Sequence, residues 1–294
     1  MAVIEVSHLK KNYGSLRALD GIDLTVGAGE VFGFIGPNGA GKSTTIRILL
    51  GLLKKDGGQA KIFDGDAWSN ASALHSRLAY VPSEVNLWPT LTGGEVIDLL
   101  ANLRGPLDKA RKTELIERFQ LDPTKKCKTY SKGNRQKVVI ISAFVSDVDL
   151  LILDEPTSGL DPLMELQFQE CIKIAKKEGK TVFLSSHILS EVEKLCDRIS
   201  IIKDGRIVEN GSISQLRHLS RTFFTIETVQ PISEKELANI AGVHEVKRVD
   251  GTLSFSVDPD ALASVTKKIA DFGLTRIHSI PPTLEELFMR HYQS

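Results

Sequence analysis

An eight-residue segment near the N-terminus has the residue types and spacing of a phosphate-binding loop. It fits the pattern G-x-x-x-x-G-K-[ST], follows the apolar run Val31–Ile35 and precedes a run with helical character. Glycines let successive backbone N–H groups converge on an anion, and a helix that begins here adds partial positive charge. The segment predicts a nucleoside triphosphate site formed by Gly36, Pro37, Asn38, Gly39, Ala40, Gly41, Lys42, Ser43 and Thr44.

Two side chains of this loop are expected to meet the charge of the ligand. The Lys42 ammonium would reach the β- and γ-phosphates, and the Ser43 hydroxyl would bind Mg²⁺. The alternative is a glycine-rich turn that only connects a strand to a helix. The strand, the helix and every required residue type agree with the nucleotide site, which we therefore favour.

A second candidate for chemistry is a pair of carboxylates at the end of an apolar run. Asp154 and Glu155 follow Leu150–Leu153 directly. Asp154, at the end of the predicted strand, is suited to hold the Mg²⁺ of a bound nucleotide. Glu155 points the other way and can polarise an attacking water. The alternative, two acids that merely enter a turn at Pro156, does not account for the phosphate loop upstream.

Composition narrows the function classes. The chain has 294 residues, enough for one large and one small domain, and its 37 basic and 37 acidic residues cancel. We therefore expect no nucleic-acid partner. Its three cysteines stand far apart, which indicates unpaired buried thiols in a reducing compartment. We expect no signal peptide, and the apolar runs are far shorter than the roughly 20 residues of a membrane helix.

The elements around these residues predict an α/β fold of the P-loop NTPase type. Leu150–Leu153, a helix over about 164–178 and Val182–Ser185 form a parallel crossover unit at the core. Ile4–Leu9 and Ile22–Val26 alternate as strands of an antiparallel subdomain do. A helical insertion occupies about 84–145. This first domain is expected to span 1–219.

Residues 220–294 are expected to form a small α+β accessory domain. The order of predicted elements is strand, helix, strand, strand, helix, strand, which is that of a ferredoxin-like unit. Ser233 and Glu236 have capping-box spacing, and Asp250-Gly251 is typical of a hairpin turn. Thr283 and Glu286 predict a cap for a final helix.

Three further segments make the chain resemble the ABC-type ATPases. They are Tyr130–Lys137, which contains Ser-Lys-Gly-Asn, then Ser158–Asp161, and then Leu184–His187. With the phosphate loop and the Asp154-Glu155 pair, they resemble the signature, the D-loop and the switch histidine of that family, in the same order. The resemblance runs over about 3–219.

The resemblance implies a role for further residues. Tyr13 would stack on adenine, although an ordinary aromatic at a strand edge is the alternative. Ser131, Gly133 and Asp161 would contact ATP held on the other subunit of a dimer. His187, at the end of a strand and before an amphipathic helix with Ile188, Val192 and Leu195, would reach the γ-phosphate and orient the attacking water or Glu155.

The chain departs from the family pattern at two places. Lys132-Gly133-Asn134 stands where Gly-Gly-Gln is usual, so a cation and a side chain replace a glycine. Ser83 and then Glu84 stand where a glutamine that binds Mg²⁺ is expected after Pro82. The Ser83 hydroxyl is a candidate metal ligand but is short, and Glu84 is an equal candidate for the same role.

The family implies ATP and Mg²⁺ as ligands and an ATPase that powers a membrane transporter. Its partners would be a separate membrane-spanning permease and either a second copy of this chain or a paralogous ATPase, on the inner face of the cell membrane. Pro281–Phe288 is similar to the tail of subunits that serve bacterial exporters of drugs, antimicrobial peptides or polysaccharides. Two alternatives are an ATP-driven switch on ribosomes or DNA, and a kinase, which would leave Ser131 and His187 without a use.

Overall fold

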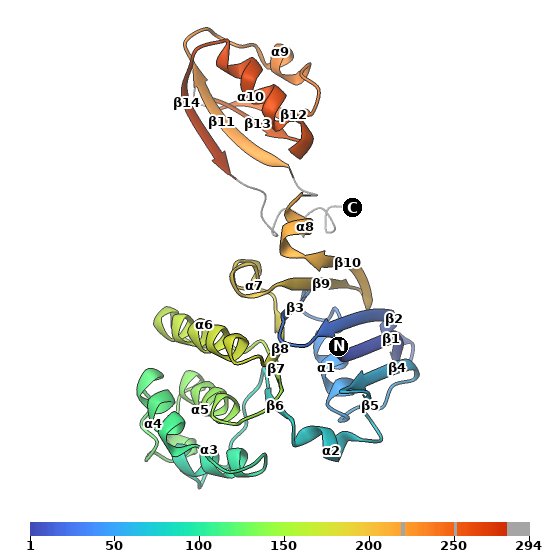
Figure 1. Cartoon of the computed structure of the whole chain (residues 1–294), viewed down its shortest axis with the longest axis vertical. Coiled ribbons are helices and arrows are strands. Elements are labelled where there is room, and N and C mark those ends of the chain that lie inside the picture. Colours follow the sequence, from blue (N-terminus) through green and yellow to red (C-terminus); the bar gives the residue numbers. More distant parts are fainter. Residues whose placement is uncertain (219–220, 250–251, 281–294) are drawn as a thin grey trace. The chain divides into compact units, whose positions relative to one another are not determined.

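The computed structural model describes residues 1–218, 221–249 and 252–280 (Figure 1). The chain forms two compact units, Met1–Asn210 and Gly211–Ser294. The predicted turn at Asp250-Gly251, the cap at Thr283 and Glu286, the exporter-like segment at 281–288 and the boundary near residue 219 lie outside the described residues.

A six-stranded sheet forms the centre of the first unit. The pairings of β3 with β8 and β9, of β7 with β8, and of β6 with β7 are all parallel. The prediction of a parallel core is therefore confirmed, and every residue of β3, β7 and β8 is buried, as expected for strands covered on both faces. The strand order is β10 (Arg206–Ser212), β9 (Arg198–Lys203), β3 (Val31–Ile35), β8 (Thr181–Ser186), β7 (Leu150–Asp154) and β6 (Leu78–Val81).

The second sheet of this unit is antiparallel. It joins the predicted strands, extended to β1 (Ala2–Tyr13) and β2 (Leu16–Gly27), to β4 (Gly57–Ile62) and β5 (Gly65–Asp66), which the sequence did not indicate. Helix α1 (Lys42–Leu49) packs between the two sheets: Ile46 and Leu49 share one apolar core with Leu24 of β2 and Phe183 of β8. This packing fixes the helix that begins at the phosphate loop.

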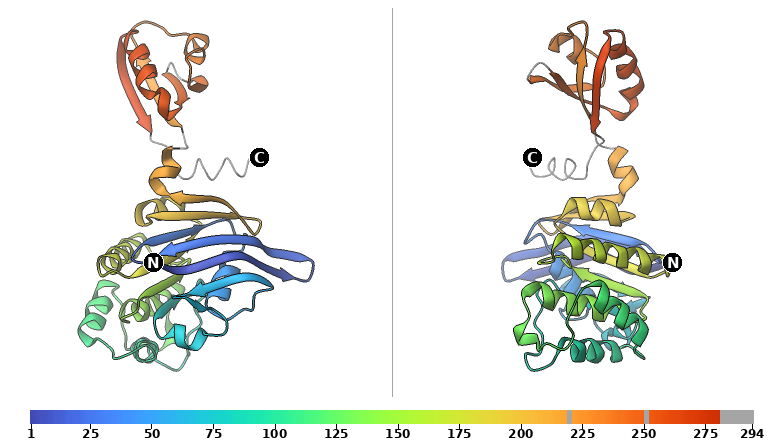
Figure 2. Two further views of the ribbon diagram at one scale, coloured as in Figure 1. Left: turned by 45° about the vertical axis from the view of Figure 1, so that its right-hand side comes forward. Right: turned by 90° about the vertical axis from the view of Figure 1, so that its left-hand side faces the viewer.

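Helices cover the rest of the parallel sheet. Figures 1 and 2 show α3, α4, α5 and α6 gathered on the side of the unit away from the antiparallel sheet. Thr92 caps the first turn of α3, in a capping box with Glu95, and Asp108 caps the first turn of α4. The helices of this unit are α1, α2 (Ala71–His75), α3 (Gly93–Asn102), α4 (Lys109–Arg118), α5 (Lys132–Phe144), α6 (Pro162–Lys177) and α7 (Leu189–Leu195).

One detail of the amphipathic helix after His187 was predicted wrongly. Ile188 does not belong to the buried face with Val192 and Leu195. It is the N-cap residue of α7, with an extended backbone and a side chain that is 39 % exposed. The chain has to leave β8 before the helix begins, so the first residue after the histidine lies outside the helical period.

The second unit contains the predicted four-stranded antiparallel sheet. Its strand order, β12-β13-β11-β14, and the helices α9 and α10 that connect its strands are those of a ferredoxin-like unit. Ser233 and Glu236 form the expected capping box. Phe224 and Phe255 stack in the core. The elements are α8 (Ile213–His218), β11 (Thr222–Thr228), α9 (Glu234–Ala238), β12 (Val243–Val249), β13 (Thr252–Val257), α10 (Leu262–Ala270) and β14 (Leu274–Ile280).

Candidate active site

The phosphate loop connects the buried strand β3 to helix α1. Gly39 and Gly41 have φ values of 83° and 114°, a backbone region that disfavours other residues. A Cβ atom on Gly36 would lie 2.4 Å from the carbonyl oxygen of Ile202. The loop can therefore keep this path only with glycine at these positions.

Lys42 is the first residue of α1, and its ammonium is held inside the loop. Only 5 % of the residue is exposed. The Nζ atom donates to the carbonyl oxygens of Gly36 at 2.6 Å and Pro37 at 3.2 Å, and lies 3.3 Å from Oε1 of Glu155. A buried cation therefore stands at the centre of the loop, where a bound phosphate would meet it.

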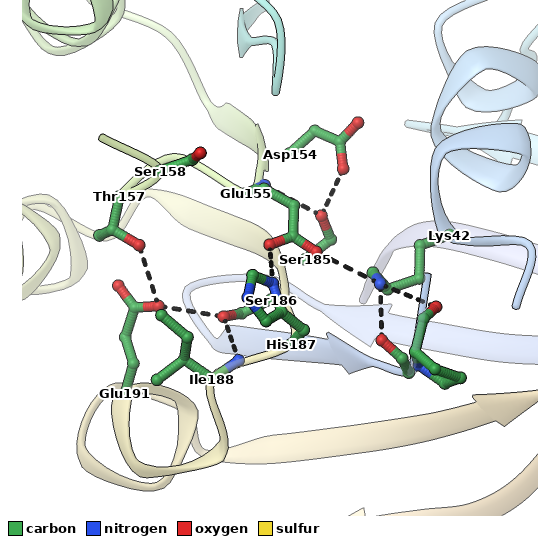
Figure 3. A network of polar contacts seen from close by, with 12 residues as sticks. Lys42, Asp154, Glu155, Thr157, Ser158, Ser185, Ser186, His187, Ile188 and Glu191 are labelled. Carbon is green, nitrogen blue, oxygen red and sulfur yellow. Dashed lines mark hydrogen bonds and ion pairs between the residues drawn. The ribbon is translucent and has the colours of Figure 1, made fainter. Parts of the chain in front are cut away.

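Asp154 ends β7 and is oriented by the neighbouring strand. It is 2 % exposed, and its Oδ1 atom accepts a 2.5 Å hydrogen bond from the hydroxyl of Ser185 on β8. Figure 3 shows the second carboxylate oxygen pointing away from Ser185. Burial and, to a lesser degree, the charge of Asp154 raise the pKa of Tyr80 to about 12, so the phenol of this β6 residue stays neutral.

Glu155 and His187 come from adjacent strand ends and contact each other. Oε2 of Glu155 is hydrogen-bonded to Nδ1 of His187, while its other oxygen faces Lys42. Glu155 has a φ of 50°, which is uncommon for a residue with a side chain and is found at functional sites. Its backbone N–H donates to the carbonyl oxygen of Ser185 at 3.1 Å. The structure therefore brings together Lys42, Glu155 and His187.

The phosphate loop and Glu155 line a cavity of about 250 Å³. Hydroxyl oxygens are ligands that Mg²⁺ accepts, so Ser43 and Ser83 here fit a magnesium nucleotide. Asp154, which directly precedes Glu155, does not line the cavity. Glu84 is exposed and does not contribute to the lining, which favours Ser83 of the two candidates. The lining residues are Pro37, Asn38, Gly39, Gly41, Lys42, Ser43, Thr44, Ser83 and Glu155.

The signature segment lies apart from this cavity and packs against the D-loop. Ser131 caps α5 by accepting a 3.2 Å hydrogen bond from the N–H of Asn134. A Cβ atom on Gly133 would lie 2.6 Å from the carbonyl oxygen of Gly159, so the two segments touch through their backbones. The Lys132 ammonium donates to the hydroxyl of Ser158 at 3.1 Å.

Two other predicted site residues are not brought to the phosphate loop either. Asp161 caps α6 and accepts a 3.0 Å hydrogen bond from the N–H of Met164. Tyr13 ends β1, is 45 % exposed, and has the Lys11 ammonium 5.8 Å from its ring centroid. The phosphate-loop cavity of this chain is lined by none of four predicted site residues, which are Asp161, Tyr13, Ser131 and Gly133.

Sequence reasoning missed three buried polar residues of the site. Ser185 orients Asp154, and Gln136 of α5, which is 1 % exposed, donates to the carbonyl oxygen of Pro156 at 2.8 Å. Glu191 of α7 accepts hydrogen bonds from Thr157 and Ser186. A polar side chain on an otherwise apolar strand or helix face was the available signal for all three.

A larger cavity, of about 570 Å³, lies beside the loop that follows α3. Four of its charged side chains are paired: Arg111 binds both oxygens of Glu178 at 2.8 and 3.0 Å, and Lys180 lies 3.4 Å from Asp147. The Arg104 guanidinium donates instead to the carbonyl oxygens of Leu78 and Leu100. None of the residues predicted to bind nucleotide lines it. Among residues 1–218, 221–249 and 252–280, no helix has the length and apolar character needed to cross a membrane.

Comparisons with known proteins give the family. The family model described as ABC transporter matches residues 19–158, and the one described as the C-terminal domain of DrrA1-3-like ATP-binding proteins matches residues 211–292. The daunorubicin/doxorubicin resistance ATP-binding protein DrrA of Streptomyces peucetius is 40 % identical over 219 residues, 73 % of this chain and 66 % of that protein. The bacitracin transport ATP-binding protein BcrA of Enterococcus faecalis is 31 % identical over 98 % of this chain and 96 % of its own.

Comparison with solved structures gives the same family. The ATP-binding subunit of an ABC transporter is 33 % identical and superimposes with a TM-score of 0.68 over 74 % of this chain and 92 % of that one. A dimeric bacterial ABC transporter cassette is 25 % identical, with a TM-score of 0.65 over 71 % of this chain and 98 % of that one. The resemblance drawn from the motifs is confirmed: the chain belongs to the ATP-binding subunits of ABC transporters, the group with a DrrA-like C-terminal domain, in which ATP hydrolysis drives transport.

Proposed function

We propose that this chain is the ATP-hydrolysing subunit of an exporter for drugs or peptides and binds a separate membrane-spanning permease at the inner face of the cell membrane. The names of DrrA and BcrA, which refer to drug resistance and bacitracin transport, support this assignment. The match of residues 211–292 to the DrrA-type C-terminal domain supports it as well.

The proposed chemistry rests on two contacts of Glu155, one with the Lys42 ammonium and one with the His187 ring. In this arrangement Glu155 neutralises the buried ammonium. The phosphates of ATP would take over that role, because they carry more negative charge and fit the backbone N–H groups of the loop. Glu155 would then be free to accept a proton from the attacking water, with His187 holding the carboxylate in place.

Magnesium would be held by Ser43, Asp154 and Ser83, and when bound it neutralises charge on the phosphates. The chain contributes the orientation of these ligands. Ser185 holds one oxygen of Asp154 and leaves the other for the metal or its water. Tyr13 would provide the surface on which adenine stacks, because its ring is partly exposed at the end of β1.

We further propose that the site is completed by a second copy of this chain or by a paralogous ATPase. Ser131, Gly133 and Asp161 do not line the cavity of their own subunit, which supports a role on the partner's nucleotide. Ser131 precedes the N-terminus of α5, whose partial positive charge favours a phosphate. ATP would hold the two subunits together, and hydrolysis would remove the charge contacts that keep them closed.

The alternative, an ATP-driven switch on ribosomes or DNA, is not favoured by the comparisons: BcrA is a transport protein by name, DrrA is named for drug resistance, and the matching family model is described as ABC transporter. One purification separates the two. The full-length tagged chain is isolated from detergent-solubilised membranes of its host, beside an unrelated tagged control. We expect a multi-spanning membrane protein in stoichiometric amount and ATPase activity in the same fraction. Ribosomes or DNA in place of a membrane protein would overturn the proposal.

A further inference from the structure

Glu191 is a buried carboxylate that no motif and none of the roles above accounts for. It lies in the first turn of α7, four residues after His187, and is 6 % exposed. Removing a carboxylate from water costs several kcal/mol unless hydrogen bonds replace the lost hydration. An apolar side chain would pack here without that cost, so the contacts of this carboxylate require an explanation.

The contacts of Glu191 join two segments that carry candidate catalytic residues. Its Oε2 atom accepts a hydrogen bond from the hydroxyl of Ser186 at 3.1 Å and one from the hydroxyl of Thr157 at 3.3 Å. Ser186 directly precedes His187, and Thr157 follows Glu155 by two residues. Figure 3 shows the carboxylate of Glu191 between these two hydroxyls.

The turn that carries His187 is closed by the same network. The backbone N–H of Ile188 donates to the Ser186 hydroxyl at 3.0 Å, and that hydroxyl donates to Glu191. On one side of His187, Ser186 is therefore bound to the carboxylate directly, and on the other side Ile188 is linked to it through Ser186. His187 itself is largely exposed, with 56 % of its side chain accessible, so its position depends on the turn rather than on packing around the ring.

The other oxygen of this carboxylate, Oε1, has no hydrogen-bond partner within the described residues. Burial raises the pKa of Glu191, and the charges of Glu165 and Glu155 raise it further, while the two hydroxyl hydrogen bonds lower it. Both hydroxyl hydrogen bonds reach Oε2, so a single carboxylate oxygen joins the two segments. This arrangement favours a role in holding the two segments together.

We propose that Glu191 is a positioning residue that fastens the His187 turn to the turn after Glu155, and so holds the histidine against that carboxylate. The inference rests on the proposed roles of Glu155 and His187. Without Glu191, His187 and Glu155 would meet in fewer conformations, and the turnover number would fall. The affinity for ATP would remain, because Glu191 does not line the phosphate-loop cavity.

The test compares variants of the full-length chain by kcat, by the Kd for ATP and by melting temperature. Glu191→Ala is expected to lower kcat about tenfold or more, which corresponds to about 1.4 kcal/mol, with Kd within twofold of the wild type. Glu191→Gln is expected to restore most of kcat, because its amide oxygen can accept both hydroxyl hydrogen bonds. Glu117→Gln, the same substitution on the exposed surface of α4, serves as the matched control and is expected to retain wild-type kcat.

A double-mutant cycle with Thr157→Val and Ser186→Ala distinguishes a positioning role of Glu191 from a general contribution to stability. Each single variant should lower kcat, and the pair should lower it no further than the stronger one, because both hydroxyls act through the same carboxylate oxygen. This cycle remains informative if Glu191→Ala does not fold. Additive effects, or wild-type kcat in a folded Glu191→Ala, would overturn the inference.

The kcat of His187→Ala is measured together with those of the Glu191, Thr157 and Ser186 variants. Wild-type kcat in that variant would refute the proposed role of His187 itself. A loss in His187→Ala together with wild-type kcat in Glu191→Ala would refute only the role of Glu191.

Discussion

The ammonium of Lys42 lies 3.3 Å from Oε1 of Glu155. The cation of the phosphate loop and the candidate base are thus paired directly, although 113 positions separate them in the chain (155 − 42). Both groups are largely buried, with side chains 6 % and 15 % exposed, so water screens the pair only weakly. Nucleotide binding and release of the base are therefore expected to be coupled, because a phosphate competes with Glu155 for the same ammonium.

The first prediction concerns Lys42. Lys42→Ala should weaken ATP binding by about 10- to 100-fold, since a hydrogen bond to a charged group contributes about 1.5–3 kcal/mol. Calorimetric titration with ATP measures the change. Lys109→Ala, on the exposed surface of α4, is the control and should bind ATP as the wild type does. Unchanged affinity in Lys42→Ala would contradict the assigned role.

The second prediction concerns Glu155. Glu155→Gln should lower kcat by about 10²- to 10⁴-fold, the usual contribution of a general base. ATP binding should persist or strengthen, because the amide no longer pairs with the Lys42 ammonium. Single-turnover hydrolysis measures the first effect, and size-exclusion chromatography with ATP should detect trapped dimers. Hydrolysis at the wild-type rate would mean that another group activates the water.

The third prediction concerns the contact between the signature segment and the D-loop. Gly133→Ala would place a methyl group 2.6 Å from the carbonyl oxygen of Gly159. Overpacking of this kind costs about 1–3 kcal/mol, so the melting temperature should fall by about 2–4 °C for each kcal/mol. ATPase activity should fall as well, because the start of α5 would shift.

Gly57→Ala is the matched control for this substitution. A Cβ atom there would meet the nearest atom, of the Lys10 side chain, at an ordinary 3.6 Å. If Gly133→Ala melts no lower than Gly57→Ala, the two backbones do not touch as described.

The fourth prediction concerns acid sensitivity of the antiparallel sheet. A hydrogen bond from Lys55, with further bonds from Ser69, lowers the pKa of Asp66 well below its usual range. Since the unfolded chain binds the proton more tightly, this contribution to stability is complete above the unfolded pKa and disappears as the pH falls through the folded one. Asp66→Asn should therefore lower the free energy of unfolding at pH 7, and the difference from wild type should shrink in acid.

Urea unfolding at neutral and acidic pH measures this dependence. Asp64→Asn, two residues away and exposed, is the control. A difference between Asp66→Asn and wild type that stays constant from pH 7 into the acid range would refute the linkage to Asp66.

The sequence alone identified the phosphate loop, the Asp154-Glu155 pair and the parallel core. These features are local. An apolar run followed by glycines or acids indicates a buried strand that ends in a turn, and phosphate and metal chemistry determine which residue types stand in that turn. The short strands β4, β5 and β6 were not predicted from the sequence. Their pairing partners lie elsewhere in the chain, so no periodicity of their own reveals them.

Contacts between strand ends could not be read from the sequence. Ser185 binds Asp154 across 31 positions, and Glu191 binds Thr157 across 34. Parallel strands bring such residues to one edge of the sheet only after the helices between them have packed. The sequence by itself predicted which side chains this ATPase would use for phosphate, metal and proton transfer. The tertiary structure decided which of them touch, because the register of β7 and β8 sets the contacts among Asp154, Glu155, Ser185 and His187.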